Sequence, residues 1–152
     1  MLTWIALFVG SVVAMEGVAI VMHKYVMHGP MWFLHKSHHE RREGWFELND
    51  LFAVFFATPS IILIYLGTHG SPLLLPIGLG MTAYGFIYFG FHDVIVHRRL
   101  PHRLRPKSRY LKRIIKAHHV HHATRSKDGA VSFGFIYAPP IDKLVAQRET
   151  AS

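Results

Sequence analysis

Three long apolar stretches constrain the fold of this chain more than any other feature of its sequence. They cover residues 2–22, 51–67 and 72–91, and Glu16 is the only charged residue in them. Each stretch is long enough to cross a hydrocarbon core of about 30 Å as a helix, the second with some thinning of the bilayer. We therefore expect an all-α integral membrane protein with about three transmembrane helices, built as a single domain over residues 1–152.

The basic residues predict how the chain is oriented in the membrane. All 17 Lys and Arg lie within residues 24–42 or 98–148. Because short loops rich in Lys and Arg stay in the cytoplasm, we expect residues 23–49 and 92–140 to form a cytoplasmic cap. The net charge of +8 thus reflects membrane topology, and we expect no nucleic acid as a partner.

Ten of the 13 histidines follow a pattern that occurs twice, HxxxxH and then HxxHH, after the first and again after the third apolar stretch. They are His23, His28, His35, His38 and His39 in the first set and His92, His97, His118, His121 and His122 in the second. Histidine offers neutral nitrogen ligands to first-row metals, and the absence of cysteine excludes thiolate sites. Ten ligands are too many for one closed zinc site, so we expect a redox-active pair of metals able to activate O2, with iron, zinc and copper all compatible with nitrogen ligands.

The two histidine spacings place different demands on a helix. In HxxHH the histidines stand at i, i+3 and i+4, so on an α-helix all three project from one face. In HxxxxH they are five residues apart and lie about 140° apart around an ideal α-helix. If the first and third transmembrane helices continue to His28 and His97, either the two histidines of a pair bind different metals or the helix is distorted at the site.

Three histidines stand outside the pattern, and we expect none of them to bind metal. His69 lies in the predicted outer turn, and His102 lies among arginines, where it is expected to be solvated. His119 is one residue out of phase with His118, and it is the exclusion that a shift in register would most easily overturn.

Two acids are candidates for a supporting role. Glu16 lies inside an apolar stretch, two helical turns before His23. Acids inside a membrane are often functional, but a hydrogen bond between helices would explain the presence of Glu16 equally well. Asp93 lies beside His92 and four residues before His97, where it is placed to orient an imidazole ligand.

Four further residues have two interpretations each. Asn49 and Asp50 are expected to cap the second transmembrane helix, with a water-linked metal contact as the alternative. Tyr84 and Tyr88 stand among glycines, which either pack closely against another helix or leave a groove for a flat substrate. The apolar residues 129–140 are too few to cross a membrane, and we expect a flap packed on the membrane face near the metals.

The chain resembles the fatty acid hydroxylase superfamily of membrane di-iron oxygenases in its histidine order and is similar to bacterial β-carotene 3-hydroxylases over roughly residues 10–140. Four stretches support the resemblance: HKYVMHGPMWFLHKSHHE, NDLFAVFFATP, GFHDVIVHRR and KAHHVHHATRSKDGAVSFGFIYAPP. The resemblance implies O2-dependent hydroxylation of β-ionone rings at C3 and C3′, from β-carotene through β-cryptoxanthin to zeaxanthin. It also implies two iron ions held by the ten histidines, electrons from a reduced ferredoxin-type donor fed by NAD(P)H, and a carotenoid taken from the lipid of a bacterial inner membrane.

Two other functions remain open from the sequence. A hydroxylase or desaturase with the same chemistry would act on acyl lipids or sterols, and product analysis separates it from a carotenoid enzyme. A non-catalytic membrane binder of metal or haem is the second alternative. Haem needs only two histidines as ligands, so eight of the ten would be unexplained. An iron content near two per chain without haem absorption would argue against this alternative.

Overall fold

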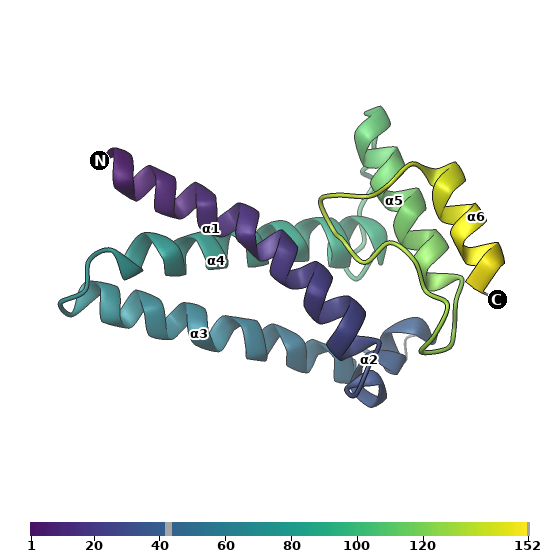
Figure 1. The fold of residues 1–152 in the computed structure, drawn as a ribbon, viewed down its shortest axis with the longest axis horizontal. Helices are drawn as coiled ribbons and strands as arrows, with labels where there is room; N and C mark the ends of the chain where they lie inside the picture. The colour runs from purple at the N-terminus through teal and green to yellow at the C-terminus, as the bar shows by residue number, and fades with distance from the viewer. Residues whose placement is uncertain (42–43, 152) are drawn as a thin grey trace.

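Three apolar helical segments run lengthwise through the molecule, and the remaining helices pack at one end of them (Figure 1). The computed structural model describes residues 1–41 and 44–151, and the regular secondary structure of that part of the chain is all helical, without strands. The segments Leu2–Met27, Leu48–Thr68 and Leu74–Val96 are long and apolar enough to cross a membrane. The expected membrane protein with three transmembrane helices is confirmed, while the side of the membrane on which the cap lies stays a prediction.

Each transmembrane segment combines an α-helix with a short helix of another type. The elements are α1 (Leu2–Val21) with the π-helix η1 (Met22–Met27), the 3-10 turn η2 (Leu48–Asp50) with α3 (Leu51–Thr68), and α4 (Leu74–Tyr88) with the π-helix η3 (Phe89–Val96). The first and third segments therefore run on past residues 22 and 91, as the uninterrupted apolar pattern predicts.

Small residues let the three long helices approach one another closely. A Cβ atom at Gly78 of α4 would lie 2.9 Å from the carbonyl oxygen of Ser60 in α3, and one at Gly80 would lie 2.6 Å from that of Phe8 in α1. The Ser60 hydroxyl also donates a hydrogen bond to the carbonyl of Gly78 over 2.8 Å. These glycines serve close helix packing, as small residues commonly do in membranes.

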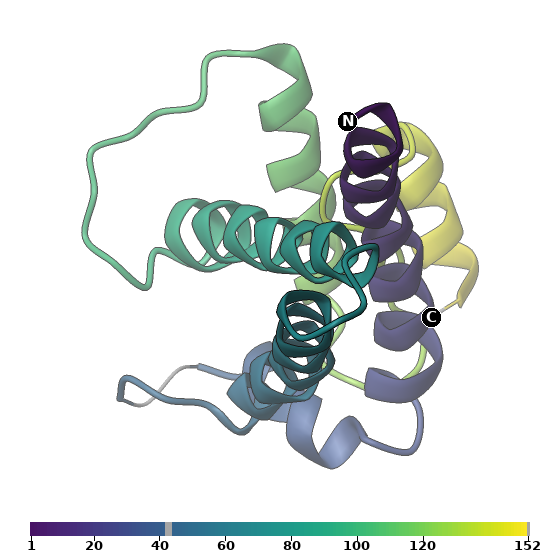
Figure 2. The ribbon, with the colours of Figure 1, turned by 90° about the vertical axis from the view of Figure 1, so that its left-hand side faces the viewer.

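The cap consists of α2 (Trp32–His39), α5 (Arg109–His122) and α6 (Ile141–Ala151), as Figure 2 shows from the end of the bundle. The helix α5 begins at Ser108, whose hydroxyl accepts a hydrogen bond from the N–H of Leu111 over 3.1 Å. The helix α6 has no counterpart in the sequence analysis. Its Leu144 packs against Ile114 and Ala117 of α5, and these three side chains are almost fully buried.

The flap of residues 129–140 returns from the cap to the membrane helices, where Glu16 holds it. One carboxylate oxygen of Glu16 accepts hydrogen bonds from the N–H groups of Phe135, Ile136 and Tyr137 over 2.9, 2.8 and 2.9 Å. The other accepts one from the Tyr84 hydroxyl over 2.7 Å. Glu16 therefore makes the expected bond between helices and, in addition, fixes the flap.

Candidate metal centre

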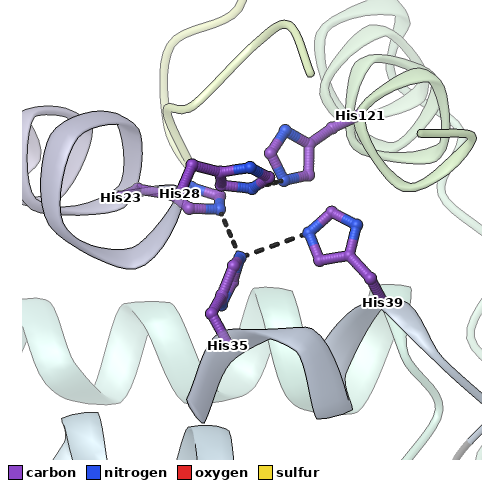
Figure 3. A group of neighbouring side chains, drawn as sticks. All are labelled: His23, His28, His35, His39 and His121. Atoms are coloured by element: carbon purple, nitrogen blue, oxygen red, sulfur yellow. Dashed lines mark hydrogen bonds between the residues drawn. The ribbon is translucent and has the colours of Figure 1, made fainter. Parts of the chain in front are cut away.

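The ten patterned histidines gather into two groups of five. Cluster A contains His23, His28, His35, His39 and His121 (Figure 3), and cluster B contains His38, His92, His97, His118 and His122. Within each cluster one ring nitrogen of every histidine lies within 4.8 Å of the others. The clusters adjoin, because the rings of His39 and His122 stack with centroids 4.4 Å apart.

Each cluster takes four histidines from one half of the sequence pattern and one from the other half. On α2, His35 and His39 face cluster A, whereas His38 faces cluster B. On α5 the arrangement is reversed: two histidines face cluster B, and His121 faces cluster A. The three histidines of an HxxHH motif thus point toward the same region, as expected, but they divide between two sites.

The HxxxxH pairs lie on π-helical turns. The N–H of His28 donates a hydrogen bond to the carbonyl of His23 over 2.9 Å, and the N–H of His97 donates one to that of His92 over 2.9 Å. This i to i+5 bonding brings residues five apart onto one side of the helix, and π-turns inside α-helices are frequent at functional sites. Of the two possibilities that the spacing left open, the structure adopts local distortion, and both members of each pair join the same cluster.

In cluster A, every Nδ1 atom faces a neutral oxygen. The contacts are His23 with the carbonyl of Phe133 (3.0 Å), His28 with that of Lys127 (2.9 Å), His35 with the amide oxygen of Asn49 (2.7 Å), His39 with the carbonyl of Thr124 (2.9 Å) and His121 with that of Val131 (3.0 Å). Because these oxygens only accept hydrogen bonds, each Nδ1 bears the proton and each Nε2 keeps its lone pair.

In cluster B, two Nδ1 atoms donate to carboxylates. His38 donates to Glu47 over 3.0 Å, and His92 donates to Asp93 over 2.9 Å. The guanidinium of Arg99 joins these acids, with contacts of 3.3 Å to Glu47, 3.8 Å to Asp93 and 2.7 Å to Asp50. Asp93 is therefore placed to orient His92, as its position in the sequence predicts.

The capping role expected for residues 49 and 50 holds for Asp50 and is wrong for Asn49. Asp50 is the N-cap residue of α3 by position, although its side chain makes no capping bond to α3 itself. The side chain accepts from the N–H of Glu47 over 3.0 Å, as half of a capping box at the start of the transmembrane segment Leu48–Thr68, and it pairs with Arg99. The Asn49 side chain is buried and contacts His35 directly, because the 3-10 turn ahead of α3 aims it at cluster A.

The ring nitrogens at the cluster centres fit metal ions. In cluster A the Nε2 atom of His23 lies 3.0 Å and that of His39 lies 3.2 Å from Nε2 of His35 (Figure 3). With the protons on Nδ1, these contacts bring lone pairs together, which is favourable only around a cation. In cluster B, Nε2 of His38 lies 3.1 Å from that of His92, and Nε2 of His122 is buried without a hydrogen-bond partner.

Burial keeps these imidazoles in the form that binds metals. Loss of hydration lowers the pKa of His35 to about 3, that of His39 to about 4 and that of His122 to about 2. The same cause holds the pKa of His118 and of His121 well below the usual value, with neighbouring histidines adding to it. At neutral pH these five rings are uncharged, which is the ligand form.

An apolar cavity of about 470 Å³ lies between α1, α3 and α4, on the membrane side of the clusters. Tyr84, Tyr88 and Phe135 are among the residues that line it. Tyr88 stacks on His92 with ring centroids 4.4 Å apart, and Phe135 stacks on His23 at 5.4 Å. The tyrosines therefore line a space beside the histidines, while Gly78 and Gly80 account for the close packing.

The three excluded histidines lie outside both clusters. His69 and His119 are exposed, and His69 contacts the carbonyl of Tyr65 over 2.8 Å. The expectation for His102 is wrong, because it is half-buried and donates to the carbonyl of Val94 over 2.8 Å.

Glu47, Arg99 and Phe135 contribute to the site but were not predicted from the sequence. A signal existed for Glu47, since the chain has only nine acids and Glu47 lies between the apolar residues Phe46 and Leu48. The flap carbonyls that orient cluster A had no such signal, because any residue supplies one.

Fold and site together define a class: membrane proteins that hold two groups of histidines, each fit for a metal ion, at one end of three transmembrane helices. The chain belongs to the fatty acid hydroxylase family, whose model matches residues 8–146. This confirms the resemblance seen in the histidine order, and it makes the chain an oxygenase, of a family in which di-iron centres are typical.

Its relatives are similar over nearly the whole chain. It is 57% identical to a beta-carotene hydroxylase of Pantoea ananas, over 94% of this chain and 82% of that protein. It is 48% identical to a beta-carotene hydroxylase of Paracoccus sp. (strain PC1), over 94% of this chain and 89% of that protein. A chloroplastic beta-carotene 3-hydroxylase 2 of Arabidopsis thaliana is 38% identical, over 95% of this chain and 48% of that protein. No solved structure gives a significant match.

Proposed function

We propose that this chain hydroxylates the β-ionone rings of carotenoids at C3 and C3′, converting β-carotene through β-cryptoxanthin to zeaxanthin. One observation supports this most strongly: an apolar cavity among membrane helices is lined by Tyr88 and Phe135, whose rings stack on His92 of cluster B and His23 of cluster A. The relatives named as beta-carotene hydroxylases point to the same substrate. We place the protein in a bacterial inner membrane with the clusters on the cytoplasmic side, where its basic residues gather.

Clusters A and B would each hold one iron ion, and the pair would supply the activation of O2 that an unactivated C–H bond demands. The chain's own residues position and enclose the reactants. Tyr88 and Phe135 form the wall between the cavity and the histidines, so a ring that reaches this wall is near both clusters. A C40 hydrocarbon resides in the bilayer, and the cavity lies between the membrane helices α1, α3 and α4. We expect an end ring of the substrate to enter this cavity directly from the lipid.

The reaction balances as a monooxygenation. One atom of O2 enters the C–H bond to form the alcohol, and the other leaves as water, which takes up two electrons and two protons. We propose that a ferredoxin-type donor, reduced by NAD(P)H, supplies these electrons. The segment between η3 and α5 stands away from the helices in Figure 2. Residues 98–116 contain nine basic residues and no acid, and all of these basic residues except Arg99 are exposed, which suits an acidic donor.

Pigment analysis tests the substrate directly. Cells that make β-carotene and express this chain should accumulate β-cryptoxanthin and zeaxanthin. Replacing His121 by Ala should abolish both products, whereas His119→Ala is the matched control on the same helix, because His119 is exposed and outside the clusters. Unchanged β-carotene with the intact chain, together with hydroxylated or desaturated acyl lipids or sterols, would favour the alternative substrate class.

A further inference from the structure

The two clusters differ in the charge of the groups that orient their histidines. All five Nδ1 atoms of cluster A contact carbonyl or amide oxygens. In cluster B, His38 and His92 donate to the carboxylates of Glu47 and Asp93. Asp128 influences His28 of cluster A from an exposed position, where solvent screens its charge.

Burial strengthens the two carboxylate contacts. The side chains of His38 and His92 are each 2% exposed, while Glu47 is 9% and Asp93 14% exposed. A hydrogen bond to an ionised acceptor is roughly twice as strong as a neutral one, and low polarity increases it further. A carboxylate on Nδ1–H also raises the basicity of the ring, which makes Nε2 a stronger donor to a metal.

Arg99 offsets part of the negative charge of these acids. Its guanidinium lies within 4 Å of Glu47, Asp50 and Asp93, and its side chain is only 14% exposed. The chain turns sharply to bring it there, since Arg98 has a φ of 51°, in the left-handed region that non-glycine residues rarely adopt. The N–H of Arg99 then donates to the carbonyl of Asp93 over 2.9 Å. The positive φ of Arg98, directly after His97, costs conformational energy, and the ion pairs of Arg99 offset this cost.

We propose that Glu47, Asp93 and Arg99 form a tuning network that makes the metal site of cluster B electronically different from that of cluster A. The two carboxylates strengthen His38 and His92 as donors, so cluster B holds its metal more tightly and favours the higher oxidation state. Arg99 is a positioning residue, because its guanidinium contacts both acids and holds them in place beside the histidines. This inference rests on the proposed two-iron centre but not on its substrate.

Mössbauer spectra of the reduced, iron-57-loaded protein test the difference between the sites. The intact chain should give two quadrupole doublets, one for each cluster. Glu47→Gln keeps an oxygen for His38 but removes the charge, and it should shift one doublet only. Asn49→Asp is the matched control, because it adds a carboxylate to His35 of cluster A, and it should shift the other doublet. One doublet that both variants alter equally would overturn the proposal.

Release of iron to a chelator gives an independent readout. The intact chain should lose iron in two phases, and Glu47→Gln or Asp93→Asn should speed the slower phase about 10–100-fold, the usual effect of losing such a partner. Asn49→Asp should slow the faster phase. If Glu47→Gln binds no iron, the Asn49→Asp variant still tests the proposal. Iron release from Asn49→Asp at the rate of the intact chain would contradict it. Neither readout involves a carotenoid, so the two proposals can fail separately. If the variants shift the two clusters as expected but the chain does not convert β-carotene, the proposed substrate is wrong and the tuning network still stands.

Discussion

Each imidazole in the clusters has its proton fixed by the oxygen that its Nδ1 atom faces. His23 and His121 face the flap carbonyls of Phe133 and Val131, so their Nε2 atoms point inward with a free lone pair. The identity of the ten ligand candidates was predictable, because the spacing repeats in the sequence. Their division between two sites was not, because it depends on the direction from which α2 and α5 approach, which the spacing does not contain.

Acidification should release iron only well below the usual histidine pKa. Burial lowers the pKa of His35 to about 3 and that of His39 to about 4, whereas in an unfolded chain both groups titrate near 6.5. Between these values the unfolded chain binds more protons than the folded one, so the folded, metal-binding state loses stability as the pH falls from 6.5. Iron measured after equilibration should be retained at about pH 6 and lost toward about pH 4. Loss of half the iron at pH 6.5 would mean that these rings are not shielded from water.

At the scale of elements, the π-helices and the flap complete the site. The apolar pattern predicted that the first and third helices extend past the bilayer. It does not distinguish an α turn from a π turn, because the same residues can form either. The position of the flap was predictable from the length and apolarity of residues 129–140. Its attachment to Glu16 was not, because the bonds run to backbone N–H groups.

Replacing Glu16 by Ala should release the flap and weaken iron binding, because three N–H groups lose their acceptor and two carbonyls move away from His23 and His121. Each buried N–H left unpaired costs about 1–3 kcal/mol. Glu16→Gln keeps an acceptor oxygen and should restore most of the iron content and the melting temperature. The comparison needs iron analysis, thermal unfolding and proteolysis of residues 129–140. Equal iron content and proteolysis in both variants and the parent would show that Glu16 does not hold the flap.

At the scale of the whole molecule, α2 and α5, which carry six of the ten patterned histidines, lie at one end of the three transmembrane helices. Because the segment Leu74–Val96 crosses the membrane between them, the α3–α4 turn and the C-terminus should lie on opposite sides. A reporter inserted at Gly70, which is exposed, should therefore score as external, and one fused after residue 152 as cytoplasmic. Reporters that score on the same side would rule out the three-helix topology.

The basic segment between η3 and α5 should influence the encounter with the electron donor. Arg105, Lys107 and Arg109 are exposed and lie outside both clusters, so reversing their charge should spare the ligand geometry. The triple reversal should raise the apparent KM for a ferredoxin-type donor and weaken its dependence on salt, with iron content unchanged. Donor kinetics that match the parent across a range of salt would assign these charges to membrane topology alone.

The iron content of the purified chain depends directly on whether it has two separate five-histidine sites. The intact protein should hold two irons per chain, one for each cluster, without haem absorption. The double variant His35→Ala/His39→Ala removes two ligands of cluster A and should keep about one iron, whereas His69→Ala/His119→Ala should keep both. An intact chain with a haem spectrum, or a cluster A variant that still binds two irons, would contradict the account.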